Sequence, residues 1–195
     1  MSSLDYSALP PDLPVPEDDG AADHLTGLEL PELDLPVAGG GSFDLRRPGL
    51  LVAFVYPRTG TPGEPLTPGW DDIPGARGCT PQSCAFRDRH DALANLGATL
   101  LGISAMDAAG QAAFAERESL PYPLANDTAL VLRDELRLPT FEAAGRTLYK
   151  RLTLVAEDGR IEKVFYPVFP PDRNAADVED YLKRGRPLGP ASATT

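Results

Sequence analysis

Continuous apolar runs mark the buried strands of this chain. "LLVAFVY" occupies 50–56 between Gly49 and Pro57, and "TLLGIS" occupies 99–104. Short uninterrupted apolar runs bounded by turn residues are typical of strands that are covered on both faces. The segment "LTLVAEDGRIEKVFY" (152–166) contains two further runs on either side of a Glu-Asp-Gly turn, which predicts a β-hairpin.

Helical patterns alternate with these runs. "TPQSCAFRDRHDALANLG" predicts one helix, with Thr80 as the N-cap, Pro81 in the first helical position and Gly97 just past the end. Three further helices are expected, and they run from Asp107 to about Glu118, over 128–137 and over 175–184. The order β–α–β–α, then a hairpin and a final helix, predicts a thioredoxin-like α/β fold, with a central mixed sheet flanked by helices.

The flanking segments predict tails around a single domain. Residues 1–26 are rich in Pro, Asp and Ser, a composition typical of an extended or disordered segment. We therefore expect a flexible N-terminal tail over 1–26, the domain over 27–186 and a frayed C-terminal tail over 187–195. At the start of the domain, a short edge strand is expected near 28–35, and "FDL" (43–45) can pair back onto it as a hairpin.

Charge and length exclude several classes of protein. The 195 residues carry a formal net charge of -11 and the pI is about 4.6. Binding to nucleic acid or to an anionic membrane surface requires a basic stripe, so we expect neither partner. No secretory signal is visible and no apolar stretch approaches the ~18 residues that span a bilayer. The cytoplasm is the expected compartment, where a permanent structural disulfide is rare.

The only two cysteines are Cys79 and Cys84, with four residues between them. Cys79 directly precedes the predicted helix, and a helix N-terminus favours the thiolate, which is the reactive form of cysteine. In a regular helix the two side chains would point ~140° apart with an axial rise of ~7.5 Å. That rise exceeds the usual Cα separation across a disulfide, so we expect a transient bridge that forms only after local unfolding. Two alternatives are that Cys84 is simply a buried apolar residue and Cys79 is incidental, or that both bind zinc with His90. The zinc site would lack a protein ligand.

The surroundings of the cysteines resemble a known family. "VAFVYPRTGTPG" and "GCTPQSCAFRD" are similar to the motifs of peroxiredoxins of the bacterioferritin-comigratory, or peroxiredoxin Q, type. In that family an apolar strand ends in Tyr-Pro and leads to Gly-Cys-Thr, to a second Cys five residues on and to Phe-Arg-Asp. "FAERESLPYPLANDT" and "YKRLTLVAEDGRIEKVF" add to the resemblance, which covers roughly residues 27–184.

The resemblance implies a role for each candidate site residue. Cys79 would be the peroxidatic cysteine and Cys84 the resolving cysteine. Arg151 would stabilise the thiolate and bind the peroxide oxygens. Pro57 would shield the site, and Thr61 would hydrogen-bond the sulfur and the peroxide.

One departure from the family motif concerns the loop before Cys79. Residues 64–77 ("EPLTPGWDDIPGAR") separate Thr61 from Cys79, and Ala76 stands where a threonine is expected when counting back from Cys79. Thr61 can loop back into the site, or Thr59 or Thr67 can substitute for it. Trp70 and Ile73 are the apolar anchors in this loop. We expect them to hold it over the entrance to Cys79 and to return Thr61 to the sulfur.

The implied activity is a thiol-dependent peroxidase that reduces hydrogen peroxide and alkyl hydroperoxides. A thioredoxin-like protein would be the reductant, no metal, flavin or nucleotide cofactor is expected, and the chain would act as a monomer or weak dimer. Two alternatives remain open. One is a general thiol–disulfide oxidoreductase, although such enzymes normally use a Cys-x2-Cys spacing. The other is a non-enzymatic redox sensor or binding module.

Overall fold

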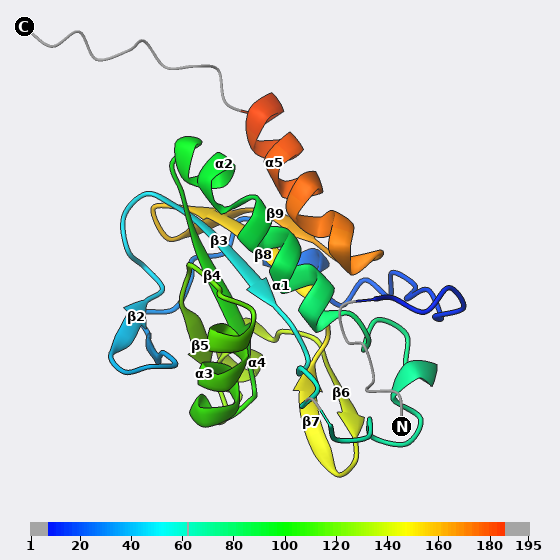
Figure 1. Ribbon diagram of the computed structural model, residues 1–195. Helices are drawn as coiled ribbons and strands as arrows, with labels where there is room; N and C mark the ends of the chain where they lie inside the picture. The colour runs from blue at the N-terminus through cyan, green and yellow to red at the C-terminus, as the bar shows by residue number, and fades with distance from the viewer. Residues whose placement is uncertain (1–7, 62, 186–195) are drawn as a thin grey trace, which may run out of the picture.

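A five-stranded mixed sheet forms the centre of the protein. The structure is a computed structural model and describes residues 8–61 and 63–185 (Figure 1). The strand order is β5-β4-β3-β8-β9. The central pair β3 and β4 is parallel, as is the pair β4 and β5, whereas β8 runs antiparallel to both β3 and β9. The strands are β3 (Leu50–Val55), β4 (Ala98–Ser104), β5 (Leu124–Asn126), β8 (Leu152–Glu157) and β9 (Arg160–Phe165).

The apolar run of β3 divides between two hydrophobic cores. Alternate residues of a strand point to opposite faces, so Leu51 and Val55 join one core while Val52 and Phe54 join the other. Every residue of β3 is buried, which confirms the strand predicted from the continuous apolar pattern. Strand β8 is buried in the same way over five of its six residues.

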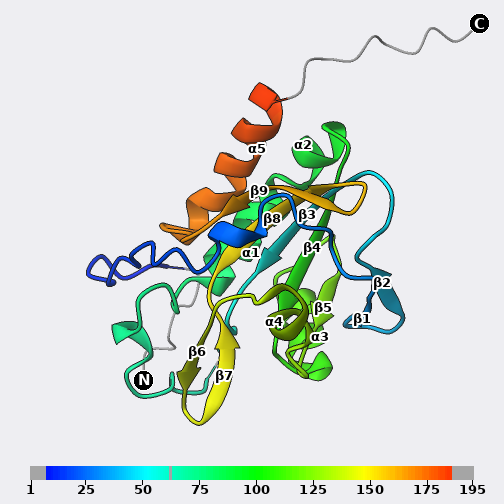
Figure 2. The same ribbon diagram turned by 180° about the vertical axis from the view of Figure 1, so that it is seen from behind.

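Helices cover both faces of the sheet, which confirms the predicted thioredoxin-like α/β fold (Figure 2). One core contains side chains of α1, α2, α3 and α5. The opposite core contains side chains of α4 and of the N-terminal segment. The helices are α1 (Cys79–Asp88), α2 (His90–Asn95), α3 (Ala108–Arg117), α4 (Val131–Leu136) and α5 (Asn174–Gly185).

The single helix predicted after Thr80 is wrong, because the segment forms two helices that are separated at Arg89. A continuous helix would place Arg89 and His90 three and four residues after buried Phe86, on its inner face. The charged side chain of Arg89 and the polar side chain of His90 would then be buried against the apolar core, which is unfavourable. The break lets Arg89 form an ion pair with Glu179 of α5 at 3.3 Å.

Two short hairpins lie outside the central sheet. The predicted N-terminal hairpin is present as β1 (Asp34–Pro36) and β2 (Ser42–Asp44), with Leu35 opposite Phe43, but its first strand is shorter and begins later than the strand expected near 28–35. A second hairpin, β6 (Thr140–Ala143) and β7 (Arg146–Tyr149), was not predicted, nor was the short strand β5.

The described part of the expected N-terminal tail is attached to the domain. The side chain of Leu25, in the 3-10 helix η1 (Asp23–Leu25), is fully buried in the core that also contains α4. Asp19 accepts hydrogen bonds from Lys150 at 2.6 Å and from Tyr166 at 2.7 Å. Residues before position 26 therefore contribute to the packed structure. The predicted C-terminal tail, 187–195, lies outside the described residues.

Among the helices in 8–61 and 63–185, none combines the length and the apolar character that a bilayer span requires.

Candidate active site

Helix α1 begins at Cys79 because the residue before it is a glycine. Gly78 is the N-cap and adopts a left-handed conformation with φ of 105°. A Cβ atom at this position would lie 2.3 Å from Cγ of Pro171 and 3.0 Å from Cδ2 of Leu9, so no other residue fits. The prediction of Thr80 as the N-cap is therefore wrong. Cys79 is the first helical residue, where unpaired backbone N–H groups and the helix dipole favour a negative charge.

Arg151 lies directly beside the Cys79 sulfur. Its Nη2 atom is 3.3 Å from Sγ, and both side chains are almost completely buried. The same Nη2 donates to the carbonyl oxygens of Ala76 at 3.2 Å and Arg77 at 3.1 Å. These bonds attach the loop before α1 to the start of β8. The guanidinium thus presents a charged N–H donor to the Cys79 sulfur.

A buried polar network holds Arg151 from the other side. Its Nη1 donates to Oε1 of Gln82, whose Nε2 donates to Oδ1 of Asn174 at 2.9 Å. The same Asn174 oxygen accepts from Thr153 Oγ1 at 2.7 Å. The network joins α1, β8 and the first residue of α5. Sequence reasoning missed it, although Thr153 is the one polar residue inside the apolar run of β8 and so was a visible signal.

A small cavity adjoins Cys79 on the side of the inserted loop. Its volume is about 20 Å³, which is enough for one water-sized molecule. Thr59 lines it and is buried, donating to Sδ of Met106. Thr61 is exposed and lines a neighbouring cavity of about 40 Å³ together with Thr67. The structure thus brings Thr59 to the cysteine rather than Thr61.

Pro57 is buried and lies two residues after the end of β3. Its carbonyl oxygen accepts a hydrogen bond from Ser104 Oγ at 2.8 Å, which joins the end of β3 to the end of β4. The three residues that follow Pro57 line the cavity beside Cys79. Pro57 therefore fixes the direction in which the chain enters the site.

Trp70 anchors the inserted loop, as expected from the sequence. It lies in the 3-10 helix η2 (Trp70–Asp72), is 5% exposed and packs against Leu148 and Phe141 of the β6–β7 hairpin. Ala76 joins the same cluster, and Trp70 also lines the cavity beside Cys79. The hairpin that the sequence did not predict is thus the surface on which the loop is held.

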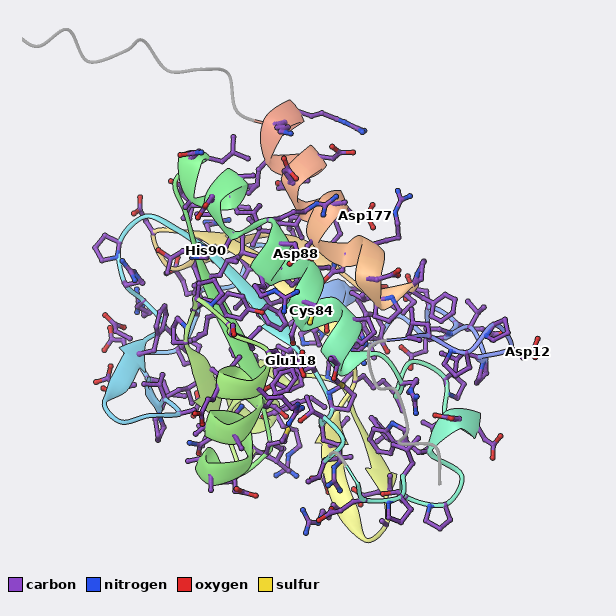
Figure 3. All side chains as sticks on the ribbon, in the orientation of Figure 1. Asp12, Cys84, Asp88, His90, Glu118 and Asp177 are labelled. Carbon is purple, nitrogen blue, oxygen red and sulfur yellow. The ribbon has the colours of Figure 1, made fainter. Side chains whose placement is uncertain are left out.

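Cys84 has different surroundings, although it lies in the same helix. Figure 3 shows it on α1, facing the end of α3, where Glu118 lies. The Cys84 thiol donates to Oε2 of Glu118 at 3.6 Å. Burial raises the pKa of Cys84 to about 11, and the Glu118 carboxylate acts in the same direction, against the nearby charge of Arg87. Cys84 is therefore a protonated thiol near neutral pH.

Both cysteines are free thiols, and both lie in regular helix within α1. Five helical residues correspond to an axial rise of ~7.5 Å, beyond the usual disulfide range of ~4.4–6.8 Å between Cα atoms. A bond between them requires α1 to unwind. Within the two described stretches, no group of three or more His, Cys, Asp and Glu side chains is placed to hold a metal ion.

A thioredoxin-like sheet with a buried cysteine at a helix start, paired to an arginine, defines a class of thiol proteins. The family model described as Redoxin matches residues 26–182, and the chain belongs to that family. Among curated proteins, the chain is 28% identical over 132 residues to chloroplastic peroxiredoxin Q of Arabidopsis thaliana. It is 27% identical over 133 residues to the Gentiana triflora protein of the same name. Each alignment covers 68% of this chain and 54% of the relative, so the chain spans about half the length of these curated relatives.

Solved structures agree with this assignment. The peroxidoxin BcpB of Mycobacterium tuberculosis matches with a TM-score of 0.66 and 28% identity, covering 83% of this chain and 98% of that one. The peroxiredoxin Q of Xanthomonas campestris matches with a TM-score of 0.65 and 22% identity, which supports the fold. The resemblance to peroxiredoxins of the Q, or bacterioferritin-comigratory, type is thus confirmed by both kinds of neighbour.

Proposed function

We propose that the protein is a thiol peroxidase that reduces hydroperoxides at Cys79. The observation that carries the proposal is the contact between Cys79 Sγ and Arg151 Nη2 at the first residue of α1. A thiolate held there has a cation and a helix N-terminus beside it, and a small cavity on its open side.

The first step is attack of the Cys79 thiolate on the terminal oxygen of the peroxide. The S–O bond forms as the O–O bond breaks, and the electron pair leaves with the other oxygen. That oxygen takes a proton and departs as water or an alcohol, while Cys79 becomes a sulfenic acid. Arg151 donates to the oxygen on which negative charge develops, which lowers the barrier. Thr59 lines the cavity beside Cys79, which supports it as the threonine that hydrogen-bonds the peroxide.

In the second step, the Cys84 thiol condenses with the sulfenic acid. An S–S bond forms, and the hydroxyl leaves with the thiol proton as water. Both sulfurs lie in α1, so its first turns must open for this bond to form. A thioredoxin-type dithiol then reduces the disulfide by exchange, which restores two thiols and leaves the reductant oxidised.

Two cysteine variants test the proposal. Consumption of hydrogen peroxide is followed with the wild type, Cys79→Ser and Cys84→Ser, with and without a thioredoxin system. Cys79→Ser should have no activity. Cys84→Ser should consume about one equivalent of peroxide and then stop as the sulfenic acid, which a mass spectrum identifies. If Cys84→Ser loses this first oxidation and Cys79→Ser keeps it, the assignment of the two roles is reversed.

Peroxide consumption, together with an assay for the reduction of insulin disulfides, separates the alternative functions. A thiol–disulfide oxidoreductase would reduce disulfides such as those of insulin without any peroxide. A binding module would neither consume peroxide nor reduce disulfides. Peroxide consumption that depends on Cys79 and on the thioredoxin system supports the peroxidase alone.

A further inference from the structure

A second, larger cavity lies behind Arg151. Its volume is about 470 Å³, within the range of sites that hold small organic molecules. Apolar side chains dominate its lining, from four separate segments of the chain. These include Val15, Ile73, Phe141 and Val168.

One wall of this cavity comes from residues that precede the family match. Val15, Pro16, Glu17 and Asp19 line it, whereas the match begins at residue 26. The Asp19 contacts with Lys150 and Tyr166 hold this segment in place. Part of the cavity wall is therefore formed by residues outside the matched range.

Arg151 belongs to both sites, because it lines this cavity and also contacts Cys79. It is 3% exposed, and its Nε atom is buried without a hydrogen-bond partner. Among the described residues, no carboxylate forms an ion pair with Arg151. A buried guanidinium with a free donor and no carboxylate partner favours an anion nearby.

The two acidic side chains in the lining, Asp19 and Glu17, do not form an ion pair with Arg151. Asp19 is engaged by Lys150 at 2.6 Å and by the Tyr166 hydroxyl. Glu17 is exposed to solvent. The negative group that faces Arg151 is then the Cys79 sulfur, whenever it is ionised.

We propose that this cavity binds an organic carboxylate with an apolar body, such as a medium-chain fatty acid. Its carboxylate would interact with Arg151, which also interacts with the Cys79 thiolate. The planar guanidinium suits a carboxylate, and the apolar walls suit an alkyl chain. The two negative groups compete, so loss of the Cys79 charge strengthens carboxylate binding. By linkage, a bound carboxylate disfavours the thiolate. The linkage to peroxide chemistry rests on the proposed function, but the binding itself does not.

Calorimetric titration of the full chain with octanoate tests the proposal. Reduced wild type is compared with Cys79→Ser, which removes the thiolate but keeps the size of the side chain. We expect octanoate to bind both, and Cys79→Ser about fivefold or more tightly, the lower end of typical coupling between sites. Acetate, which lacks the apolar body, and octanol, which lacks the charge, should bind much more weakly.

A pair of surface variants locates the site. Val15 lines the cavity and is 64% exposed, so its replacement leaves the core intact. Val15→Glu introduces a repelling charge and should weaken octanoate binding, whereas Val15→Gln should have little effect. The proposal is overturned if octanoate does not bind, if octanol binds equally well, if wild type and Cys79→Ser have equal affinities, or if both Val15 variants behave alike. Peroxide consumption is measured separately, so an inactive protein that still shows charge-linked octanoate binding would contradict the proposed function and not this site.

Discussion

Two positions in helix α1, its first residue and its middle, show how one short helix can give two cysteines different surroundings. At its first residue, Cys79 is buried against a guanidinium and the unpaired N–H groups of the helix start. Five residues on, Cys84 is partly exposed and faces the carboxylate of Glu118. The first environment presents a cation and N–H donors to the sulfur, whereas the second favours the protonated thiol. The charge of the nearest side chain and the position in the helix, rather than the cysteines themselves, make this difference.

The difference also limits when the two sulfurs can meet. The helical geometry that keeps Cys79 beside Arg151 also keeps Cys84 out of reach. Opening of α1 would release Cys79 from Arg151 and, at the same time, let Cys84 approach Cys79. The comparison therefore predicts that oxidation changes the whole segment and not only the two side chains.

Hydrogen exchange on the reduced and the disulfide-bonded protein gives the largest expected effect. Amides of α1 that are protected in the reduced protein should exchange roughly 10³-fold faster after oxidation, because local opening then costs little free energy. The inserted loop, which is attached to the start of α1 through Arg151, should lose protection with it. Helix α4, on the opposite face of the sheet, is the internal control. Equal protection of α1 in both states, with the disulfide confirmed by mass, would mean that the helix need not unwind.

Substitution of Arg151 tests the effect of the surroundings of Cys79 on its oxidation. Arg151→Ala should slow the first oxidation of Cys79 by about 10²-fold, a typical cost for losing one donor to a developing negative oxygen. Stopped-flow mixing with peroxide in a Cys84→Ser background isolates this step. Arg151→Lys keeps the positive charge but not the planar guanidinium, so its rate of first oxidation should lie between those of the wild type and Arg151→Ala. An unchanged rate in Arg151→Ala, with a normal thermal unfolding midpoint, would place Arg151 outside the chemistry.

The smallest effect concerns the stability of the reduced protein at high pH. Folding raises the pKa of Cys84 from its ordinary value of 9.0 to about 11, mainly through burial, so the folded state favours the protonated thiol. This contribution to the free energy of unfolding is complete below about pH 9 and is lost as the pH rises toward 11. Because the thiol is only partly buried, we expect a loss on the order of 1 kcal/mol. Urea unfolding at pH 8 and pH 11 measures it, with Cys84→Ser as the reference for all other titrating groups.

A matched variant separates the two causes of the Cys84 shift. Glu118→Gln removes the carboxylate but leaves the burial of the sulfur, so the pKa of Cys84 in the folded protein should lie closer to 9, and the loss of stability should still begin near pH 9 but end below pH 11 and be smaller. A loss identical to that of the wild type would assign the shift to burial alone. The same loss in Cys84→Ser would show that other groups cause it.

The sequence predicted the parts of the site that depend on local patterns. The continuous apolar run of β3, the start of a helix near Cys79 and the turn between β8 and β9 each have a signal within a few residues. Those elements determine the thioredoxin-like sheet. They also place Cys79 and Arg151 at neighbouring points of it.

What the sequence could not predict depends on contacts between distant segments. The N-cap is Gly78 because Leu9 and Pro171 leave no space for a side chain, and neither residue is near it in sequence. Likewise, Thr59 rather than Thr61 lines the cavity beside Cys79, and the same cavity is lined by Trp70, which packs on the distant β6–β7 hairpin. Motif spacing alone gave no means of choosing between these threonines.

The position of Trp70 has one practical consequence. It is the only tryptophan of the chain, and it forms part of the wall of the small cavity beside Cys79. Its indole is held in an apolar cluster, and opening of the loop would expose it to water. If oxidation opens the loop as expected, the emission spectrum of Trp70 should change with the redox state of Cys79, and the cycle can be followed in unlabelled protein.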